Sequence, residues 1–217
     1  MRSHLSTRVV SVAGLLMLLA ACSDRALGPS KYAPLPPGAP RPDIIMNNVA
    51  ADSLSADFTV TPSGGTFILG QHAVVFPANS ICDPATTAYG PDQWDVPCTP
   101  VDTAVSFHAE IRGDTVGSAI YFTPNVRFVP TADPNQYVWL LLKVPGAVNT
   151  DQPQRFPMLW QPDGSTEQID EAVSDPTLKT YLYAPGGIVF RRIKHFSGYN
   201  CWGAIFAELS DVVPVDY

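Results

Sequence analysis

His195, Phe196 and Ser197 form the one group in this chain whose types and spacing suggest chemistry. A serine hydroxyl becomes a nucleophile when a base takes its proton, and histidine is well suited to move a proton near neutral pH. Gly198 and Tyr199 follow directly. The competing interpretation is structural: Phe196 fills the core, while Ser197 and Gly198 form a bend or bulge between two strands.

Two further kinds of site can be weighed against this group. A Ser-His-Asp hydrolase could use His72, His108 or His195, but the chain has no G-x-S-x-G elbow and its β-only pattern does not suit that fold. A lone strand histidine is more often an ordinary hydrogen-bonded side chain.

A calcium site could use Asp83, Asp92 and Asp95, because carboxylate oxygens suit calcium. These residues lack the D-x-D-x-D-G spacing, and aspartates that form turns explain them as well. We therefore predict no metal site and no cofactor.

The chain also has four tryptophans, which could form an aromatic surface for glycans. Trp139 and Trp202 lie in apolar strand runs and are expected in the core. Trp94 and Trp160 are then the better candidates for a binding surface.

The elements that must position these residues are short strands. Alternation of apolar and polar residues, with turn residues between the runs, predicts about nine to eleven strands and no long helix. Such spacing is typical of an antiparallel β-sandwich. The run at 136–144 is apolar enough to be a central strand buried on both faces. The expected strands are 57–62, 66–69, 73–76, 101–112, 118–129, 136–144, 156–161, 178–183, 187–194 and 200–209.

Composition agrees with a packed, loop-rich domain. The 217 residues are 46% hydrophobic and 15% charged, and 22 of them are proline. Proline confines strands to edges and favours rigid loops. The net charge of −7 argues against nucleic acid as a partner, because phosphate binding needs a basic surface.

Residues 1–21 have the pattern of an export signal, with Arg2 and Arg8 before an apolar stretch too short to span a bilayer. The stretch ends at Cys22 in a sequence that resembles the lipobox of bacterial lipoproteins. The resemblance implies that Cys22 is lipidated and anchors the protein to a membrane. Because Ser23 rather than aspartate follows Cys22, it also implies the outer membrane of the cell envelope.

Residues 22–56 are expected to be the lipidated cysteine and a proline-rich linker, and 57–217 the folded domain. The stretch 33–42 is rich in proline and favours an extended polyproline conformation. The linker would hold the domain away from the lipid surface.

Cys82 and Cys98 flank a polar loop with few apolar residues of its own. In an exported protein a disulfide can persist, so we favour a Cys82–Cys98 bond over two free thiols. Such a bond would contribute about 3 kcal/mol by closing the loop. Cys201, in an apolar strand, is expected to be a buried small hydrophobe.

Two stretches resemble the ZU-five domain of ankyrins, netrin receptors and zonula occludens proteins. Residues 64–67 with 74–78 are similar to its opening glycines and strands, and 195–199 to its closing motif, which also occurs in bacterial lipoproteins. The likeness covers about residues 57–209. It implies a β-sandwich that mediates protein contacts. The segment 82–98 departs from the animal pattern.

In some members of that family the chain cuts itself at the same tripeptide. The resemblance therefore implies, as an alternative function, cleavage of the Phe196–Ser197 bond. In that reaction the Ser197 hydroxyl would attack the Phe196 carbonyl, His195 would move the proton, and strain in the turn would raise the energy of the peptide bond. We expect instead a binding protein, not an enzyme. Its partner would be another envelope protein or a glycan, with self-cleavage as the alternative.

Overall fold

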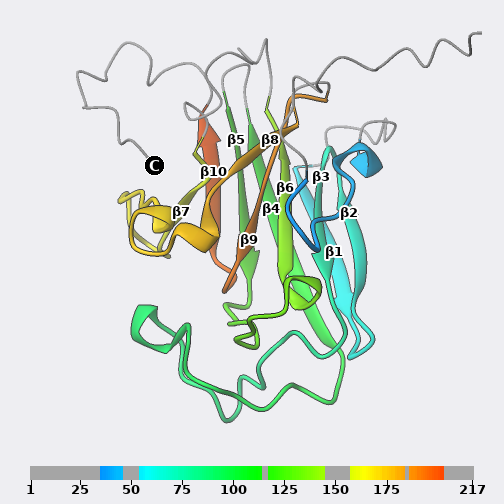
Figure 1. The fold of residues 1–217 in the computed structure, drawn as a ribbon, viewed down its shortest axis with the longest axis vertical. Helices are drawn as coiled ribbons and strands as arrows, with labels where there is room; N and C mark the ends of the chain where they lie inside the picture. Colours follow the sequence, from blue (N-terminus) through cyan, green and yellow to red (C-terminus); the bar gives the residue numbers. More distant parts are fainter. Residues whose placement is uncertain (1–34, 46–53, 114–116, 145–156, 184–185, 203–217) are drawn as a thin grey trace, which may run out of the picture. The chain divides into compact units, whose positions relative to one another are not determined.

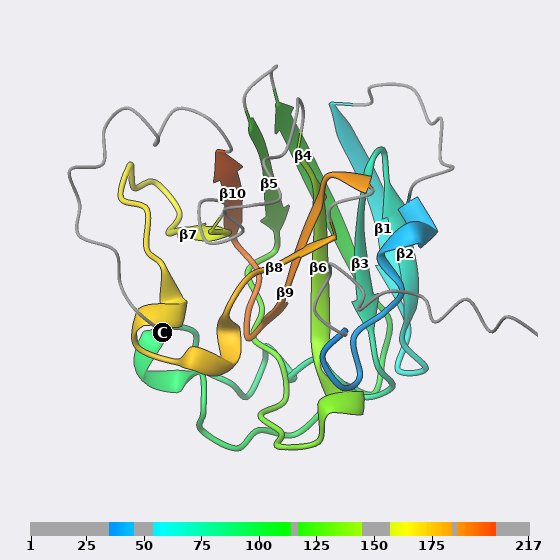
Figure 2. The same cartoon turned by 45° about the horizontal axis from the view of Figure 1, so that its top comes forward.

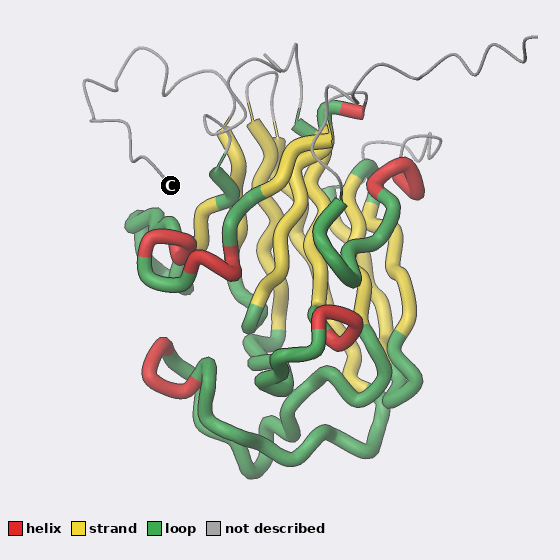
Figure 3. Tube along the Cα trace, in the orientation of Figure 1, coloured by secondary structure: helices red, strands yellow, loops and turns green. Residues whose placement is uncertain are grey.

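The protein is an antiparallel β-sandwich. The structure, a computed structural model, describes residues 35–45, 54–113, 117–144, 157–183 and 186–202. In these residues ten strands form two five-stranded sheets that lie face to face (Figure 1). This confirms the predicted fold class and strand number. The helices of the described residues are short 3-10 turns (Figure 3), and none is long and apolar enough to cross a membrane.

Each sheet mixes strands from distant parts of the sequence. Sheet A has the order β1 (Ser55–Val60), β4 (Val105–Gly113), β5 (Gly117–Thr123), β10 (Gly198–Trp202), β7 (Leu159–Gln161). Sheet B has the order β2 (Gly65–Leu69), β3 (His72–Phe76), β6 (Val138–Lys143), β9 (Ile188–Ile193), β8 (Tyr181–Tyr183). The 3-10 turns are η1 (Pro42–Ile45), η2 (Pro91–Gln93), η3 (Pro134–Gln136), η5 (Glu171–Val173) and η6 (Pro176–Leu178).

Several strands are shorter than the alternation predicts. β5 ends at Thr123 rather than at 129, because Pro124 follows and cannot donate to a ladder. Beyond it the chain makes single bridges, Arg127 with His195 and Phe128 with Ile81. β8 begins at Tyr181 because Pro176–Leu178 form η6.

The space between the sheets is filled mainly by aromatic and branched side chains. β6 lies at the centre of sheet B and its residues from Val138 to Leu142 are all buried, which confirms the prediction of a strand covered on both faces. Leu140 and Leu142 belong to the core between the sheets. Trp139 and Leu141 point to the opposite face and belong to a second apolar cluster.

The second cluster is covered by residues 35–45, which we had expected to be part of an extended linker. Pro42 and Ile45 are buried, and Ile45 packs with Trp139 and Phe190 on the outer face of sheet B. Figure 2 shows this segment, in blue, lying against β3 and β6. The outer face of sheet B is apolar and needs a cover, so the folded unit begins well before residue 57.

Candidate functional site

The group at 195–197 lies where the chain passes from one sheet to the other. β9 belongs to sheet B and β10 to sheet A, so the two strands do not pair with each other as neighbours (Figure 2). The backbone N–H of Phe196 donates to the Val126 carbonyl at 2.7 Å, and the Ser197 carbonyl accepts from Phe122 N–H at 3.0 Å. His195, Phe196 and Ser197 are all buried. The crossing is therefore fixed by hydrogen bonds on both sides of the Phe196–Ser197 bond.

The Phe196 ring anchors this crossing in the core, as the structural interpretation predicts. It stacks on Phe122 with ring centroids 3.8 Å apart, and it meets Phe107 and Phe128 edge to face with centroids 5.1 Å away. Burial of an aromatic side chain of this kind contributes several kcal/mol. The peptide bond that follows Phe196 is held as firmly as the core itself.

Gly198 is fixed in β10 and does not form a loose bend. It pairs with Tyr121 on one side and Gln161 on the other. A Cβ atom at this position would lie 2.6 Å from Tyr121 Cε1, so only glycine allows the Tyr121 ring to lie across the strand. Neither Phe196 nor Ser197 has a positive φ angle. Among the non-glycine residues of the described chain, only Asn79 does. The strain expected at this turn is not seen as a positive φ.

The carbonyl oxygen of Phe196 accepts a hydrogen bond from the hydroxyl of Tyr89 at 2.6 Å. Tyr89 is 38% exposed as a residue, with its hydroxyl directed inwards to this contact. Burial raises the pKa of Tyr89 to about 12, while a hydrogen bond from the Ser197 side chain acts in the opposite direction. Tyr89 therefore keeps its proton at neutral pH and acts as a donor to this carbonyl.

The hydroxyl of Ser197 is oriented by an indole. Trp160 Nε1 donates to Ser197 Oγ at 2.6 Å, and both side chains are buried. An indole N–H can only donate, so Ser197 accepts in this bond and its own proton is not committed to Trp160. The Ser197 side chain also makes a hydrogen bond to Tyr89, so its proton is directed towards the Tyr89 oxygen.

His195 is oriented by a buried ion pair. Its Nε2 lies 2.8 Å from Glu171 Oε1, and Arg191 donates to Glu171 Oε2 at 2.5 Å. Glu171 is the first residue of η5, whose N-cap is Asp170. A carboxylate can only accept, so we assign the proton to Nε2, which leaves Nδ1 as an acceptor. Tyr199 adds a hydrogen bond at 3.0 Å to the His195 carbonyl.

The charges in this group follow from burial and pairing. Burial alone raises the pKa of Glu171, but the hydrogen bond from His195 and the charge of Arg191 outweigh it and the pKa is lowered. Burial lowers the pKa of His195, against the opposing effect of Glu171. Glu171 is thus charged and paired with Arg191, and His195 is a neutral base at pH 7.

The structure places a tyrosine where we had expected the histidine to act directly. No hydrogen bond in the described chain joins the His195 ring to Ser197. The Tyr89 hydroxyl lies 3.5 Å from His195 Nδ1 and 2.6 Å from the Phe196 oxygen. Because the Tyr89 proton is donated to the Phe196 oxygen and Nδ1 carries no proton, Tyr89 lies between the histidine ring and this carbonyl without passing a proton from one to the other.

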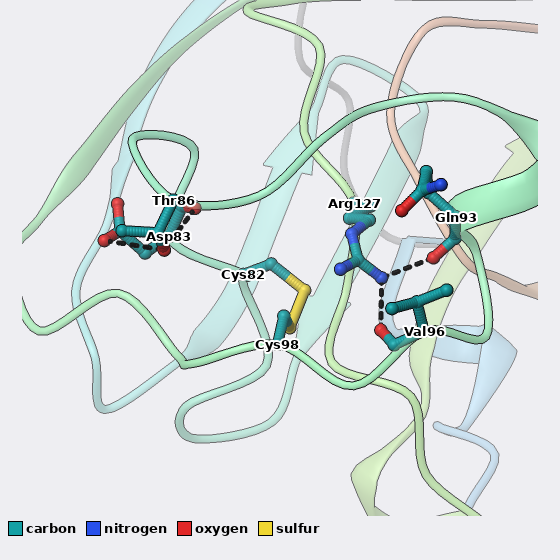
Figure 4. The surroundings of a disulfide bond; sticks show 7 residues. All are labelled: Cys82, Asp83, Thr86, Gln93, Val96, Cys98 and Arg127. Carbon is teal, nitrogen blue, oxygen red and sulfur yellow. Dashed lines mark hydrogen bonds between the residues drawn. A yellow bond between two sulfur atoms is a disulfide. The ribbon is translucent and has the colours of Figure 1, made fainter.

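Tyr89 comes from the loop between Cys82 and Cys98, which are joined in a disulfide, as predicted (Figure 4). Arg127 holds the far part of the loop through the carbonyls of Gln93 and Val96. The loop thus covers the 195–197 crossing. The disulfide joins its two ends, and Arg127 holds its second half.

Two predictions about tryptophan are wrong. Trp94 and Trp160 were expected on a glycan-binding surface, but each is only 7% exposed. Trp94 stacks on the His195 ring at 4.0 Å, and Trp160 contacts it at 4.9 Å. Trp139 is buried, as predicted; Trp202 lies on β10, and its side chain is outside the described part.

The remaining candidates are dispersed. His72 is buried and accepts from the Lys143 backbone N–H at 3.2 Å. His108 is exposed and pairs with Asp57 at 2.6 Å on the outer face of sheet A. Asp83 closes a turn with Thr86, and Asp95 pairs with Lys194. The described residues contain no group of three side chains that could hold a metal.

Cys201 is buried in the core, where burial raises the pKa of its thiol to about 12. Cys22 and the export signal lie outside the described residues. The lipid anchor therefore stays a prediction.

Compared with known protein families, curated proteins and solved structures, the chain matches none of them. The geometry of the crossing is thus the main guide to function. It unites a buried serine oriented by an indole, a carbonyl with a strong donor, and a neutral histidine held by a carboxylate. Such an arrangement can carry out acyl transfer within the chain.

Proposed function

We propose that this domain cuts its own chain between Phe196 and Ser197. One observation carries the proposal. Ser197 Oγ accepts from Trp160 at 2.6 Å inside the core, so the hydroxyl is held in one orientation and its own proton is not used in that bond. A nucleophile held next to its target gains greatly in effective concentration.

The reaction is an internal acyl shift followed by hydrolysis. Ser197 Oγ forms a bond to the Phe196 carbonyl carbon, the bond from that carbon to the Ser197 nitrogen breaks, and the hydroxyl proton ends on that nitrogen. Water then adds to the ester, which restores the serine hydroxyl and leaves a carboxylate on Phe196. The neutral His195, whose ring Glu171 holds, would serve as the base, and its ring would have to approach the Ser197 hydroxyl during the reaction because it makes no hydrogen bond to it in the described chain.

The products would stay together. The new N-terminal residue, Ser197, immediately precedes β10, which pairs with β5 on one side and β7 on the other. A strand with two neighbours keeps its ladder when one peptide bond is lost. The cut would thus leave residues 197–217 bound to the sandwich.

The test is the intact mass of the full chain under denaturing conditions. The wild type should give two fragments that meet at the Phe196–Ser197 bond, and Ser197→Ala should give one uncut species. Ser106→Ala, which removes an exposed serine on β4, should be cut like the wild type. A single uncut species in the folded wild type would refute the proposal.

We also propose that the domain is a lipid-anchored protein of the cell envelope with a ZU-five-like sandwich. The support is the sequence around Cys22 and the residues at 64–78 and 195–199. Labelling with a palmitate analogue should be lost in Cys22→Ser and kept in Ser23→Ala. Label that persists in Cys22→Ser would exclude the anchor.

A second candidate function is binding of a polymer of the envelope, on the outer face of sheet A. Polar pairs run across β1 and β4 there: Asp57 with His108 at 2.6 Å, and Thr59 with Ser106 at 3.0 Å. They line a shallow hollow of about 390 Å³. Hydroxyl and carboxylate groups in a row suit the hydroxyls of a glycan.

Sedimentation with purified peptidoglycan tests this second function. The wild type should sediment with the polymer, and Thr59→Ala/Ser106→Ala should do so less. Thr66→Ala, an exposed threonine on β2, serves as the control. Equal sedimentation of all three proteins, or none, would exclude this face.

A further inference from the structure

The disulfide loop supplies more to the crossing than cover. Only Tyr89 in the described chain places a side-chain donor on the Phe196 carbonyl oxygen, and it does so from 107 residues away in the sequence. When Ser197 attacks, negative charge develops on this oxygen. A donor already in place in a buried site stabilises that charge strongly.

We propose that Tyr89 is a catalytic residue of the cut, and that the Cys82–Cys98 disulfide switches the cut on by fixing Tyr89 against the Phe196 carbonyl. The inference rests on the proposed self-cleavage and names its regulation. It requires that the position of Tyr89 depend on the disulfide.

The contacts of the loop support this dependence. Its second half is held to the rest of the domain without the disulfide: Arg127 binds the carbonyls of Gln93 and Val96, and Asp95 pairs with Lys194 at 2.7 Å. The half that carries Tyr89 is held differently. Within the described chain, residues 84–90 make hydrogen bonds to the sandwich outside the loop only through the Tyr89 hydroxyl, which contacts residues 195–197.

The other contacts of residues 84–90 do little to fix the position of Tyr89. Asp83 donates its backbone N–H to the Thr99 carbonyl at 2.8 Å, which holds the start of the loop. Its side chain accepts hydrogen bonds from Ala85 and Thr86, which shape a turn but do not tie residues 84–90 to the sandwich. The Tyr89 ring touches Trp94 at 4.8 Å. The covalent bond between Cys82 and Cys98 closes the loop and so reduces the number of conformations open to residues 84–90. Tyr89 can then take fewer positions.

Oxidation of the two thiols to the disulfide removes two electrons and two protons. An oxidant such as oxidised glutathione accepts them and is itself reduced to two thiols. In a reducing compartment the loop would lack the bond and Tyr89 would leave the carbonyl for part of the time. The cut would then be slow until the chain reaches an oxidising compartment. The disulfide would thus delay the cut until after export.

The experiment is cell-free synthesis of the full 217-residue chain in oxidised or reduced glutathione buffer, with release of the 197–217 fragment followed over time. In oxidised buffer Tyr89→Phe should cut at least about tenfold more slowly than the wild type. Tyr137→Phe, which removes a hydroxyl that donates to the Ala132 carbonyl at 3.4 Å, should cut at the wild-type rate. Reduction should slow the wild type about as much as Tyr89→Phe does, or less, and should slow Tyr89→Phe little further.

The outcomes separate the two proposals. If the wild type is cut and Tyr89→Phe is cut equally fast, Tyr89 is not catalytic and self-cleavage stands. If reduction slows Tyr89→Phe as much as the wild type, the disulfide does not act through Tyr89. If folded, oxidised wild type is not cut at all, both proposals fall. Thermal melting by circular dichroism shows that each variant is folded, and Cys82→Ser/Cys98→Ser should behave like reduced wild type.

Discussion

The indole nitrogen of Trp160 lies 2.6 Å from the hydroxyl oxygen of Ser197, and both side chains are fully enclosed in the domain. Trp160 reaches it from β7, the strand at the edge of sheet A. This contact orients the hydroxyl and satisfies a buried donor and a buried acceptor at once. Its removal therefore affects stability as well as chemistry.

We predict that Trp160→Phe lowers the free energy of unfolding by about 1–3 kcal/mol, because it leaves the buried Ser197 hydroxyl without its donor and opens a small gap. Self-cleavage should slow as well, since Oγ loses its orientation. Urea unfolding measures the first effect and fragment release the second.

Trp139→Phe is the matched control. Trp139 is also buried, but its indole nitrogen has no hydrogen-bond partner among the described residues, and it lies on the outer face of sheet B. The variant should lose packing only and keep the wild-type rate of cutting. A cut slowed as much in Trp139→Phe as in Trp160→Phe would show that the hydrogen bond is not what matters.

Glu171→Gln should be among the most damaging substitutions. It removes the carboxylate that pairs with Arg191 and leaves a buried guanidinium without a counter-charge. Breaking one side of a buried ion pair costs about 3–5 kcal/mol. The midpoint of urea unfolding measures this loss.

The exposed pair of Glu110 and Arg112 provides the comparison for Glu171. Solvent screens that pair, so Glu110→Gln should change the unfolding midpoint only slightly. An equal decrease of the unfolding midpoint in the two variants would mean that the buried Glu171–Arg191 pair contributes no more to stability than the exposed pair.

The sequence predicts those parts of this molecule that depend on local pattern. Alternation gives the strands of both sheets, the apolar run at 136–144 gives the central strand β6, and a polar loop between cysteines gives the disulfide. Phe196 in the core also follows from its place between two apolar runs.

The rest depends on contacts between distant residues. Trp94 lies in a loop with no periodicity, so nothing in its neighbourhood indicates that it stacks on His195. Glu171 precedes no motif, and its role appears only when η5 is placed beside β9. Proline content predicts that residues 35–45 are extended, but not that the outer face of sheet B needs them as a cover.

Acid should destabilise the domain through His72. Burial lowers the pKa of this side chain from 6.5 to about 4. Between these values the unfolded chain binds a proton that the folded chain does not, so stability is full above pH 6.5 and falls as the pH drops towards 4. The loss amounts to about 3 kcal/mol.

His72→Gln tests this, because glutamine keeps an acceptor for the Lys143 N–H and does not titrate. The difference in unfolding free energy between pH 7 and pH 4.5 should be smaller in His72→Gln than in the wild type. Gln71→Ala, at the exposed neighbouring position, should keep the wild-type difference. Equal pH dependence in all three would exclude His72 as the group responsible.

Gly38→Ala should loosen the segment that covers sheet B. Gly38 has φ +73°, and a Cβ atom there would lie 2.0 Å from the Pro134 carbonyl oxygen. Backbone atoms on both sides would have to move, so the packing of Ile45 on Trp139 would suffer.

Gly164→Ala has a similar φ of +69° with open space around it, and isolates the backbone cost of about 1 kcal/mol. We expect Gly38→Ala to lower the unfolding free energy by at least about 1 kcal/mol more than Gly164→Ala, since close contact adds to the backbone cost. Equal losses would mean that residues 35–45 do not contribute to the stability of the sandwich.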